Sequence, residues 1–246
     1  MLEKQLAFES DGPKRVMPGP RDAAMPPGSR PRRVVQTAPL IEEQALLRLG
    51  YRSIAGMDEA GRGSWAGPVV AAAVILPLDE PELSRRLVGV RDSKLLTAMS
   101  RARLFDIIQQ HAVAVSVAMA SPADVDRMNV LEATKLAMRQ ALAGLSCTAD
   151  CLLLDAVRLD GVPLPQWPIV GGDRRSLTVA AASIVAKVTR DRYMLEAQTH
   201  YPDFRFGSHK GYGTAGHQAE LQRSGPSNLH RRSFAPIRRL IEGMPL

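Results

Sequence analysis

The chain has 246 residues, of which 45% are hydrophobic, and it carries a formal net charge of +7. This length and apolar content suffice for one domain with a substantial core, and the positive charge favours a polyanionic partner. No apolar run reaches the 18 residues that a membrane-spanning helix needs, and the first residues lack the basic-then-apolar order of a secretion signal. We therefore expect a cytoplasmic protein that does not enter a membrane.

The N-terminal segment differs in composition from the rest of the chain. Seven of the 18 prolines fall between Pro13 and Pro39, among scattered arginines and few large apolar residues. Such a stretch cannot bury enough apolar surface to offset its loss of chain entropy. Residues 1–38 are therefore predicted to be a disordered extension.

The cysteine content argues against a structural zinc site. Cys147 and Cys151 are the only two cysteines, and no second pair or nearby histidine completes a ligand set. We expect both to be buried free thiols in a reducing compartment.

Helical and strand patterns alternate from residue 41 onward. The predicted elements are a helix over 41–49, strands over 52–58 and 68–76, a helix over 100–111, a strand over 112–120, a helix ending at 143, strands over 151–154 and 167–170, and helices over 176–200, 214–223 and 236–243. The short gap between the first two strands predicts a hairpin. A capping box over Ser121–Asp124 starts the helix there, or else it starts at Asn129. The order predicts an α/β fold, with a mixed sheet flanked by helices and a helical C-terminal tail.

Acidic residues follow three apolar, strand-like runs, at Asp58, Asp155 and Asp173. Ligands of open α/β sheets gather beyond strand ends, so we expect these acids to meet. Glu59 joins them only if the strand bends or stops after Asp58, since neighbours on a strand point to opposite faces, and Gly61 favours such a bend. One such acid alone would be read as a solvated loop residue or a helix cap. Four together would raise one another's pKa, and Mg²⁺ or Mn²⁺ would relieve their repulsion.

A glycine-flanked arginine, Gly61-Arg62-Gly63, follows the first two acids. Glycines let another backbone come close, and acids hold a metal that bridges phosphates. The combination indicates a metal-dependent enzyme that acts on nucleic acid. A dinucleotide-binding loop is excluded, because the full GxGxxG spacing is absent and two acids stand where the pyrophosphate would lie.

These segments resemble ribonuclease HII. In family order, the matching pieces are DEAGRG at 58–63, AGPVVAAAVIL at 66–76, DSK at 92–94, LLLDA at 152–156, GD at 172–173, AASIVAKVTRD at 181–191, HKGYGT at 209–214 and HRRSFAP at 230–236. Together they cover about residues 40–240. The resemblance implies a ribonuclease H-like catalytic domain over 39–200 and a basic helical C-terminal region over 201–246 that carries a tyrosine loop.

The resemblance also implies an activity and a set of roles. The enzyme would cleave RNA in RNA–DNA hybrids and cut 5′ to single ribonucleotides embedded in duplex DNA, leaving 3′-hydroxyl and 5′-phosphate ends. Mn²⁺ or Mg²⁺ would be held by Asp58, Glu59 and Asp155, with Asp173 as the fourth catalytic carboxylate. The substrate-binding residues would be Gly61, Arg62 and Gly63 at the 2′-hydroxyl, Ser93 and Lys94 at backbone phosphates, and Tyr212 stacked on the neighbouring deoxyribose.

Two positions depart from the family pattern. A lysine often precedes the fourth carboxylate, whereas this chain has Gly171-Gly172-Asp173, which puts the local charge balance in question. The tyrosine loop often continues with proline, and here Gly213 follows Tyr212. Glycine lacks the fixed φ of proline, so we expect a looser loop.

Other polar residues have weaker signals. Asp191 lies on the apolar side of its helix, and a structural ion pair is favoured over a fifth catalytic acid. The C-terminal histidines lack tight ligand spacing, which favours phosphate contact or plain surface over zinc. The C-terminal arginines are expected to contact the duplex backbone rather than form a merely solvated helix face. The residues in question are His209, His217 and His230, and Arg231, Arg232, Arg238 and Arg239.

Alternatives remain open at this point. A ribonuclease HIII-like or resolvase-like nuclease would share the fold, but a ribonuclease HIII would be expected to carry a folded N-terminal substrate-binding domain. A non-catalytic hybrid-binding protein on the same scaffold would be favoured by loss of a carboxylate, and all four are present. We expect a monomer whose partners are RNA–DNA hybrids and ribonucleotide-containing duplex DNA.

Overall fold

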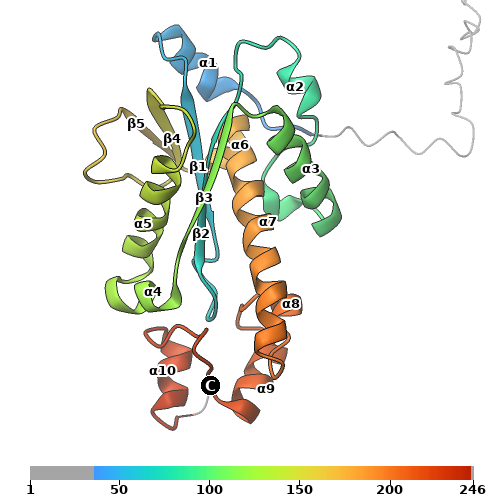
Figure 1. The fold of residues 1–246 in the computed structure, drawn as a ribbon, viewed down its shortest axis with the longest axis vertical. Coiled ribbons are helices and arrows are strands. Elements are labelled where there is room, and N and C mark those ends of the chain that lie inside the picture. The colour runs from blue at the N-terminus through green and yellow to red at the C-terminus, as the bar shows by residue number, and fades with distance from the viewer. Residues whose placement is uncertain (1–35, 245–246) are drawn as a thin grey trace, which may run out of the picture. The chain divides into compact units, whose positions relative to one another are not determined.

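The computed structural model describes residues 36–244 (Figure 1). The predicted disordered extension falls almost entirely on residues 1–35, which lie outside the described residues. Five strands form one sheet in the order β3-β2-β1-β4-β5. Their bounds are β1 Ile54–Ala60, β2 Val69–Ile75, β3 Ala114–Ala120, β4 Cys151–Asp155 and β5 Gln166–Ile169.

The sheet is mixed, as predicted. β1 and β2 form the expected antiparallel hairpin, and β3 adds antiparallel to β2. On the other side of β1, β4 and β5 run parallel to it. The two apolar parallel strands bring the end of β4 beside the middle of β1, which is how distant acids become neighbours.

The helices differ from the prediction mainly in short additions. Their bounds are α1 Ile41–Arg48, α2 Leu83–Arg86, α3 Ala98–His111, α4 Pro122–Met128, α5 Val130–Ala143, α6 Gly172–Arg175, α7 Leu177–His200, α8 Phe206–His209, α9 Ala215–Ser224 and α10 Ala235–Ile241, with a 3₁₀ turn η1 over Ser93–Leu95. The capping box at Ser121 and Asp124 is confirmed. The helix that follows divides at Asn129, whose φ of +73° breaks α4 and whose side chain caps α5. The unpredicted α2, α6, α8 and η1 have three or four residues each, too few for a periodic pattern.

Two layers of helices enclose the sheet (Figure 1). α7 covers one face and α4 with α5 the other. The α7 side holds Ala72 and Val74 of β2, while the α5 side holds Val69 and Ile75 of β2 with Met57 and Leu154. α7 is largely apolar because it is buried against β1 and β2. Gly56 on β1 has no Cβ, and this lets the backbone of Thr178 approach β1 closely.

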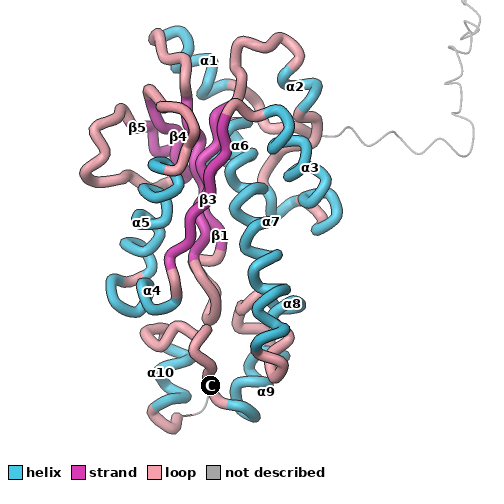
Figure 2. The backbone as a smooth tube through the Cα atoms, in the orientation of Figure 1, coloured by secondary structure: helices cyan, strands magenta, loops and turns pink. Residues whose placement is uncertain are grey.

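The C-terminal residues pack around the far end of α7, where the sheet has ended and short helices alternate with loops (Figure 2). Met194 and Ala197 of α7 meet Phe204 and Phe206 there. Leu195, on the same turn of α7, is 57% exposed because this turn contacts the C-terminal cluster through Met194 and Ala197. Within residues 36–244, no helix combines the length and apolar character that crossing a membrane requires.

Candidate active site

The sheet register brings two of the predicted acids together. Met57 of β1 pairs with Leu154 of β4, so Asp58 and Asp155 follow at the next position on adjacent parallel strands. The bend expected between Asp58 and Glu59 is absent: the antiparallel pairing with β2 continues through Ala60. Backbone hydrogen bonds to β2 keep β1 regular until it ends at Ala60. Glu59 nevertheless lies close to the other acids, since its charge raises the pKa of Asp58 and the charge of Asp155 raises the pKa of Glu59.

Asp58 is buried, at 4% exposure. Its Oδ1 accepts a hydrogen bond from the Glu59 amide at 2.7 Å. Burial, followed by repulsion from Glu59 and then from Asp155, raises the pKa of Asp58 well above its usual value, although the Ser183 hydroxyl on α7 opposes the shift. Ser183 was not singled out by sequence reasoning, although it lies in a segment that carried the resemblance.

Asp155 ties the end of β4 to α6. Its Oδ1 accepts a hydrogen bond from the Gly172 amide at 2.9 Å. A Cβ on Gly172 would lie 3.6 Å from the same oxygen and 3.2 Å from Val179, so glycine suits this close approach. The carboxylate is therefore fixed by backbone before any ligand arrives.

Glu59 has one oxygen paired and one without a partner. Oε1 lies 3.1 Å from Nη1 of Arg62, whereas Oε2 is buried with no hydrogen-bond partner. Burial raises the pKa of Glu59, the charge of Arg62 opposes this, and Asp155 adds to the increase. A buried carboxylate oxygen without a partner is costly, so this atom is suited to a ligand.

Asp173 lies in α6 with 3% exposure, close to a fifth acid. Burial first, and then Asp92, raises the pKa of Asp173 to about 6. Asp92 is itself buried; burial would raise its pKa, but hydrogen bonds from the Lys94 amide and the Arg174 side chain outweigh burial and lower it. Asp92 opens the Asp-Ser-Lys segment of the resemblance, and sequence reasoning gave roles only to the two residues after it.

The missing lysine is replaced by cations from elsewhere in the fold. Nζ of Lys94 lies 3.8 Å from Oδ2 of Asp173, and Nε of Arg174 lies 3.3 Å from Oδ2 of Asp92. Gly171 takes a φ of +67° at the start of α6, a conformation that favours glycine. The charge balance that the sequence left in question is therefore met from η1 and α6.

The acids fit a divalent cation that shares its ligands with substrate. Within residues 36–244, no three His, Cys, Asp or Glu side chains converge as a preformed cage. Mg²⁺ and similar ions commonly use only one or two carboxylates and complete their shell with water and phosphate. The partnerless Glu59 Oε2 and the raised pKa of Asp58 both indicate that positive charge is lacking here.

Two buried arginines hold the glycine-rich loop from beneath. Arg190 of α7 donates to the carbonyls of Pro68, Ala66 and Lys210. Gly61 has a φ of +93°, and a Cβ there would overlap the Arg190 side chain. Neither arginine was assigned this role from the sequence, because their partners are backbone carbonyls that leave no residue pattern.

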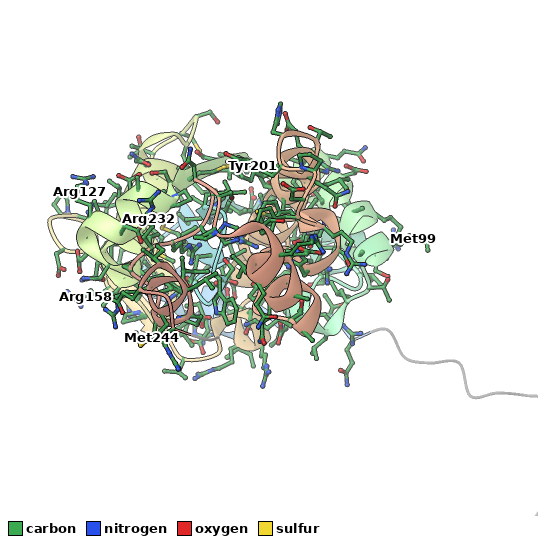
Figure 3. All side chains as sticks on the ribbon, turned by 90° about the horizontal axis from the view of Figure 1, so that it is seen from below. Met99, Arg127, Arg158, Tyr201, Arg232 and Met244 are labelled. Atoms are coloured by element: carbon green, nitrogen blue, oxygen red, sulfur yellow. The ribbon has the colours of Figure 1, made fainter. Side chains whose placement is uncertain are left out.

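Arg231 is the second of these arginines and corrects a prediction. It is fully buried and donates to the carbonyls of Gly67 and Arg62, at 3.0 and 2.9 Å, so it does not lie free to contact a duplex. Burial, and then the charge of Arg190, lowers the pKa of Arg231 to about 9. The other three C-terminal arginines are exposed, and Arg232 lines a surface pocket with Arg127 on one side of the molecule (Figure 3).

The tyrosine loop is firmly seated against the glycine-rich loop. The Trp65 amide donates to the Gly211 carbonyl at 2.8 Å, and a Cβ on Gly213 would overlap the Trp65 indole. The looser loop expected from Gly213 is therefore wrong, because Trp65 fills the space that a proline ring would need. Tyr212 itself is 37% exposed, with the Arg190 guanidinium 5.6 Å from its ring centroid.

The remaining predictions concern Asp191, the two cysteines and the C-terminal histidines, and only some of them are confirmed. Asp191 pairs with Lys187 at 2.7 Å and with Arg101 at 3.6 Å, which confirms a structural ion pair. Both cysteines are free, although only Cys151 is buried and Cys147 is half-buried. The placement of the three C-terminal histidines at the surface is wrong: each is at most 9% exposed.

Acids gathered beside two parallel strands of a ribonuclease H-like sheet, facing an arginine-supported glycine loop, define a nuclease of that fold class. A family model described as Ribonuclease HII matches residues 55–237. The chain is 53% identical over 198 residues to the ribonuclease HII of Chloroflexus aurantiacus, covering 79% of this chain and 92% of that protein. The ribonuclease H2 of Pyrococcus horikoshii OT3 has a similar structure, with a TM-score of 0.67, 26% identity, and coverage of 78% of this chain and 98% of that one.

This chain belongs to the ribonuclease HII family, hydrolytic endoribonucleases that cleave RNA in RNA–DNA hybrids. The predicted fold and family are thereby confirmed, and the family depends on divalent metal ions. A solved ribonuclease HIII (Bst-RNase HIII) in complex with Mn²⁺ shares the fold at a TM-score of 0.59 and 18% identity, covering 80% of this chain and 72% of that one. The family match favours ribonuclease HII over the HIII-like and resolvase-like alternatives.

Proposed function

We propose that this chain cuts duplex DNA on the 5′ side of an embedded ribonucleotide, as well as the RNA of hybrids, and leaves 3′-hydroxyl and 5′-phosphate ends. The observation that carries the proposal is a direct link between the glycine-rich loop and the acids. Arg62 of the loop pairs with Glu59 at 3.1 Å, so a sugar bound at the loop lies next to the carboxylates. A ribose that is recognised there is thereby placed for cleavage.

Asp58, Glu59 and Asp155 are the proposed ligands of Mn²⁺ or Mg²⁺, with Asp173 as the fourth catalytic carboxylate. Support comes from the partnerless oxygen of Glu59 and from the mutual repulsion of the acids. When bound, such ions would polarise the scissile phosphate, activate a water and stabilise the leaving oxygen. The Glu59 and Gly172 amides hold Asp58 and Asp155 in place, which reduces the reorganisation that ligand binding requires.

Recognition of the 2′-hydroxyl is assigned to Gly61, Arg62 and Gly63. A Cβ on Gly63 would meet no atom within 4 Å, which leaves room for a sugar edge to approach the backbone. Only RNA presents a 2′-hydroxyl at that edge. Tyr212 has an exposed ring that would stack on the deoxyribose after the ribonucleotide.

Phosphate contact is assigned to Ser93 and Lys94. The Lys94 side chain is 77% exposed and free to reach a phosphate near Asp173. The Ser93 hydroxyl is buried and shares a hydrogen bond with Ser183 at 2.9 Å, so Lys94 carries most of this contact. We keep monomeric state and cytoplasmic location as predictions from the sequence.

The test is cleavage of a labelled DNA duplex that contains one ribonucleotide, with Mn²⁺ or Mg²⁺ present. Cleavage 5′ to the ribonucleotide, with mapped 3′-hydroxyl and 5′-phosphate ends, is the expected result. An all-DNA duplex and the Asp155→Asn variant should remain uncut. Cleavage of long hybrids but not of the single-ribonucleotide duplex would reject the finer substrate assignment. Binding without cleavage by the wild type would instead favour a hybrid-binding protein.

A further inference from the structure

The mechanism above uses none of the three buried histidines of the C-terminal cluster. His209 and His217 stack with ring centroids 4.2 Å apart, and His217 contacts His230 through their Nε2 atoms at 2.9 Å. Phe204 and Phe206 enclose them. All six ring nitrogens have partners, although the site is largely apolar.

Backbone partners determine which nitrogens carry protons. The Ser227 amide donates to Nδ1 of His230 at 2.9 Å, so the proton of His230 is on Nε2. The carbonyl of Tyr212 is 3.0 Å from Nδ1 of His217 and can only accept, so His217 carries its proton on Nδ1. The Nε2 atom of His217 is then free to accept from Nε2 of His230. With these neutral tautomers, each hydrogen bond from Ser227 through His230 and His217 to Tyr212 has one donor and one acceptor.

His209 follows the same rule on the other side of the tyrosine loop. The Gly211 amide donates to its Nδ1 at 3.2 Å, which leaves the proton on Nε2 to be donated to Glu220 at 2.8 Å. Arg205 pairs with the other oxygen of Glu220 at 2.9 Å. The loop is thus held by neutral imidazoles, and the buried Glu220 carboxylate is balanced by Arg205, whose side chain is 72% exposed.

Burial is the main reason why these imidazoles remain neutral. It lowers the pKa of His217 to about 4 and of His230 to about 3, and repulsion between neighbouring histidines adds to the effect. Protonation of either ring would place two N–H groups against each other or against the Ser227 amide. Simple packing would not need these polar contacts, because an apolar ring of similar size fills such a space without satisfying any donor.

We propose that His217 and His230 are positioning residues which, through this chain of hydrogen bonds, fix the peptide of Tyr212 and hence the direction of its ring. We call the chain Ser227–His230–His217–Tyr212 the histidine relay. The Tyr212 amide also donates to the His209 carbonyl at 2.9 Å, so the peptide groups on both sides of Tyr212 are held. The inference rests on the proposed stacking of Tyr212 on a deoxyribose, and it assigns the specificity of that contact to residues that never touch substrate.

The relay can be tested apart from activity by ¹⁵N NMR of the histidine side chains in the full chain at pH 7. We expect Nε2–H tautomers for His209 and His230 and an Nδ1–H tautomer for His217. An Nε2–H tautomer at His217, or a cationic ring at any of the three, would overturn the proposal. This readout does not depend on whether Tyr212 contacts substrate.

The activity test uses a matched pair of substitutions. Asparagine places an amide near the position of imidazole Nδ1, so His217→Asn keeps a donor for the Tyr212 carbonyl, whereas His217→Gln places its amide near Nε2 and loses that donor. We expect His217→Gln to lower kcat/KM for a single-ribonucleotide duplex by about three- to tenfold, as loss of one hydrogen bond predicts. His217→Asn should recover most of the activity. His200→Gln, at the exposed end of α7, is the control and should behave as wild type.

A double variant separates positioning from general stability. If the relay acts through Tyr212, adding His217→Gln to Tyr212→Ala should cause no further loss of kcat/KM. Equal losses for His217→Asn and His217→Gln, or multiplying losses in the double variant, would reject the positioning role. If Tyr212→Ala alone cleaves as wild type, the proposed stacking fails, while the NMR pattern still decides whether the relay exists.

Discussion

The carboxylate cluster and the histidine relay both bury titratable groups, yet they do so with opposite results. In the relay every ring nitrogen has a hydrogen-bond partner, and burial keeps the rings in their neutral form. In the carboxylate cluster Glu59 keeps a buried oxygen without a partner, and Asp58 is repelled by its neighbours. A satisfied polar network acts as a rigid support, whereas an unsatisfied one marks the place where a ligand binds.

The largest contrast is expected when a charge is removed from the carboxylate cluster. Asp58→Asn should lower cleavage by about a thousandfold or more, since it removes a proposed metal ligand. The same change should raise the Tm of the metal-free protein by roughly 2–4 °C per kcal/mol of repulsion relieved. Activity assays and thermal denaturation in a chelator test the two effects. Asp160→Asn, at an exposed residue paired with Lys135, is the control. A lower Tm for Asp58→Asn would contradict the electrostatic account.

The loop between the two regions offers a matched glycine pair. Gly61→Ala should destabilise the protein by roughly 1–3 kcal/mol, because the residue has a positive φ and its Cβ would overlap Arg190. Gly63→Ala meets open space and should leave the free energy of unfolding nearly unchanged. Denaturant unfolding measures both. Equal losses of stability would mean that Arg190 does not hold this loop closely.

Lowering the pH should change the stability contributed by the two regions in opposite directions. A carboxyl whose pKa is raised in the folded protein, such as Asp173 at about 6, stabilises the fold when the pH is below the pKa of the same carboxyl in the unfolded chain. This contribution is lost as the pH rises through 6. A histidine with a lowered pKa makes the fold lose stability as pH falls from about 6.5 toward 4. Asp173→Asn should therefore steepen the loss of stability between pH 6.5 and 4, by on the order of 1 kcal/mol. Urea unfolding of the metal-free proteins across this range is the measurement. Parallel profiles for wild type and variant would contradict the predicted pKa of Asp173.

The smallest effect is expected at the exposed rim of the carboxylate cluster. Lys94→Ala should raise KM by about threefold and reduce the slope of log affinity against log salt by about 1, as loss of one phosphate contact predicts. It should not change kcat by a similar factor, since the side chain is mostly solvated. Binding titrations over a range of salt concentrations test this, with Lys135→Ala as a distant control. An unchanged salt slope would remove Lys94 from the phosphate-binding residues.

Much of the site was visible in the sequence because its signals are local. Asp58, Asp155 and Asp173 each follow an apolar run, and the Gly61–Gly63 loop is contiguous. The structure differed where long-range contacts decide. Asp92 was passed over because its closeness to Asp173 depends on how η1 meets α6. The bend expected after Asp58 failed because pairing with β2 holds β1 straight.

By itself, the sequence determined the α/β class, the hairpin, the capping box at Ser121 and the resemblance that the family comparison confirmed, since each depends on residues close together in the chain. Only the tertiary structure decided that Arg231 is buried beneath the glycine-rich loop, and that His217 and His230 form a relay instead of a surface. The physical reason is that burying a basic residue is costly unless it is hydrogen-bonded, so the sequence alone predicts a surface position. Only the fold supplies the backbone carbonyls and neutral side chains that satisfy its hydrogen bonds and so allow it to be buried.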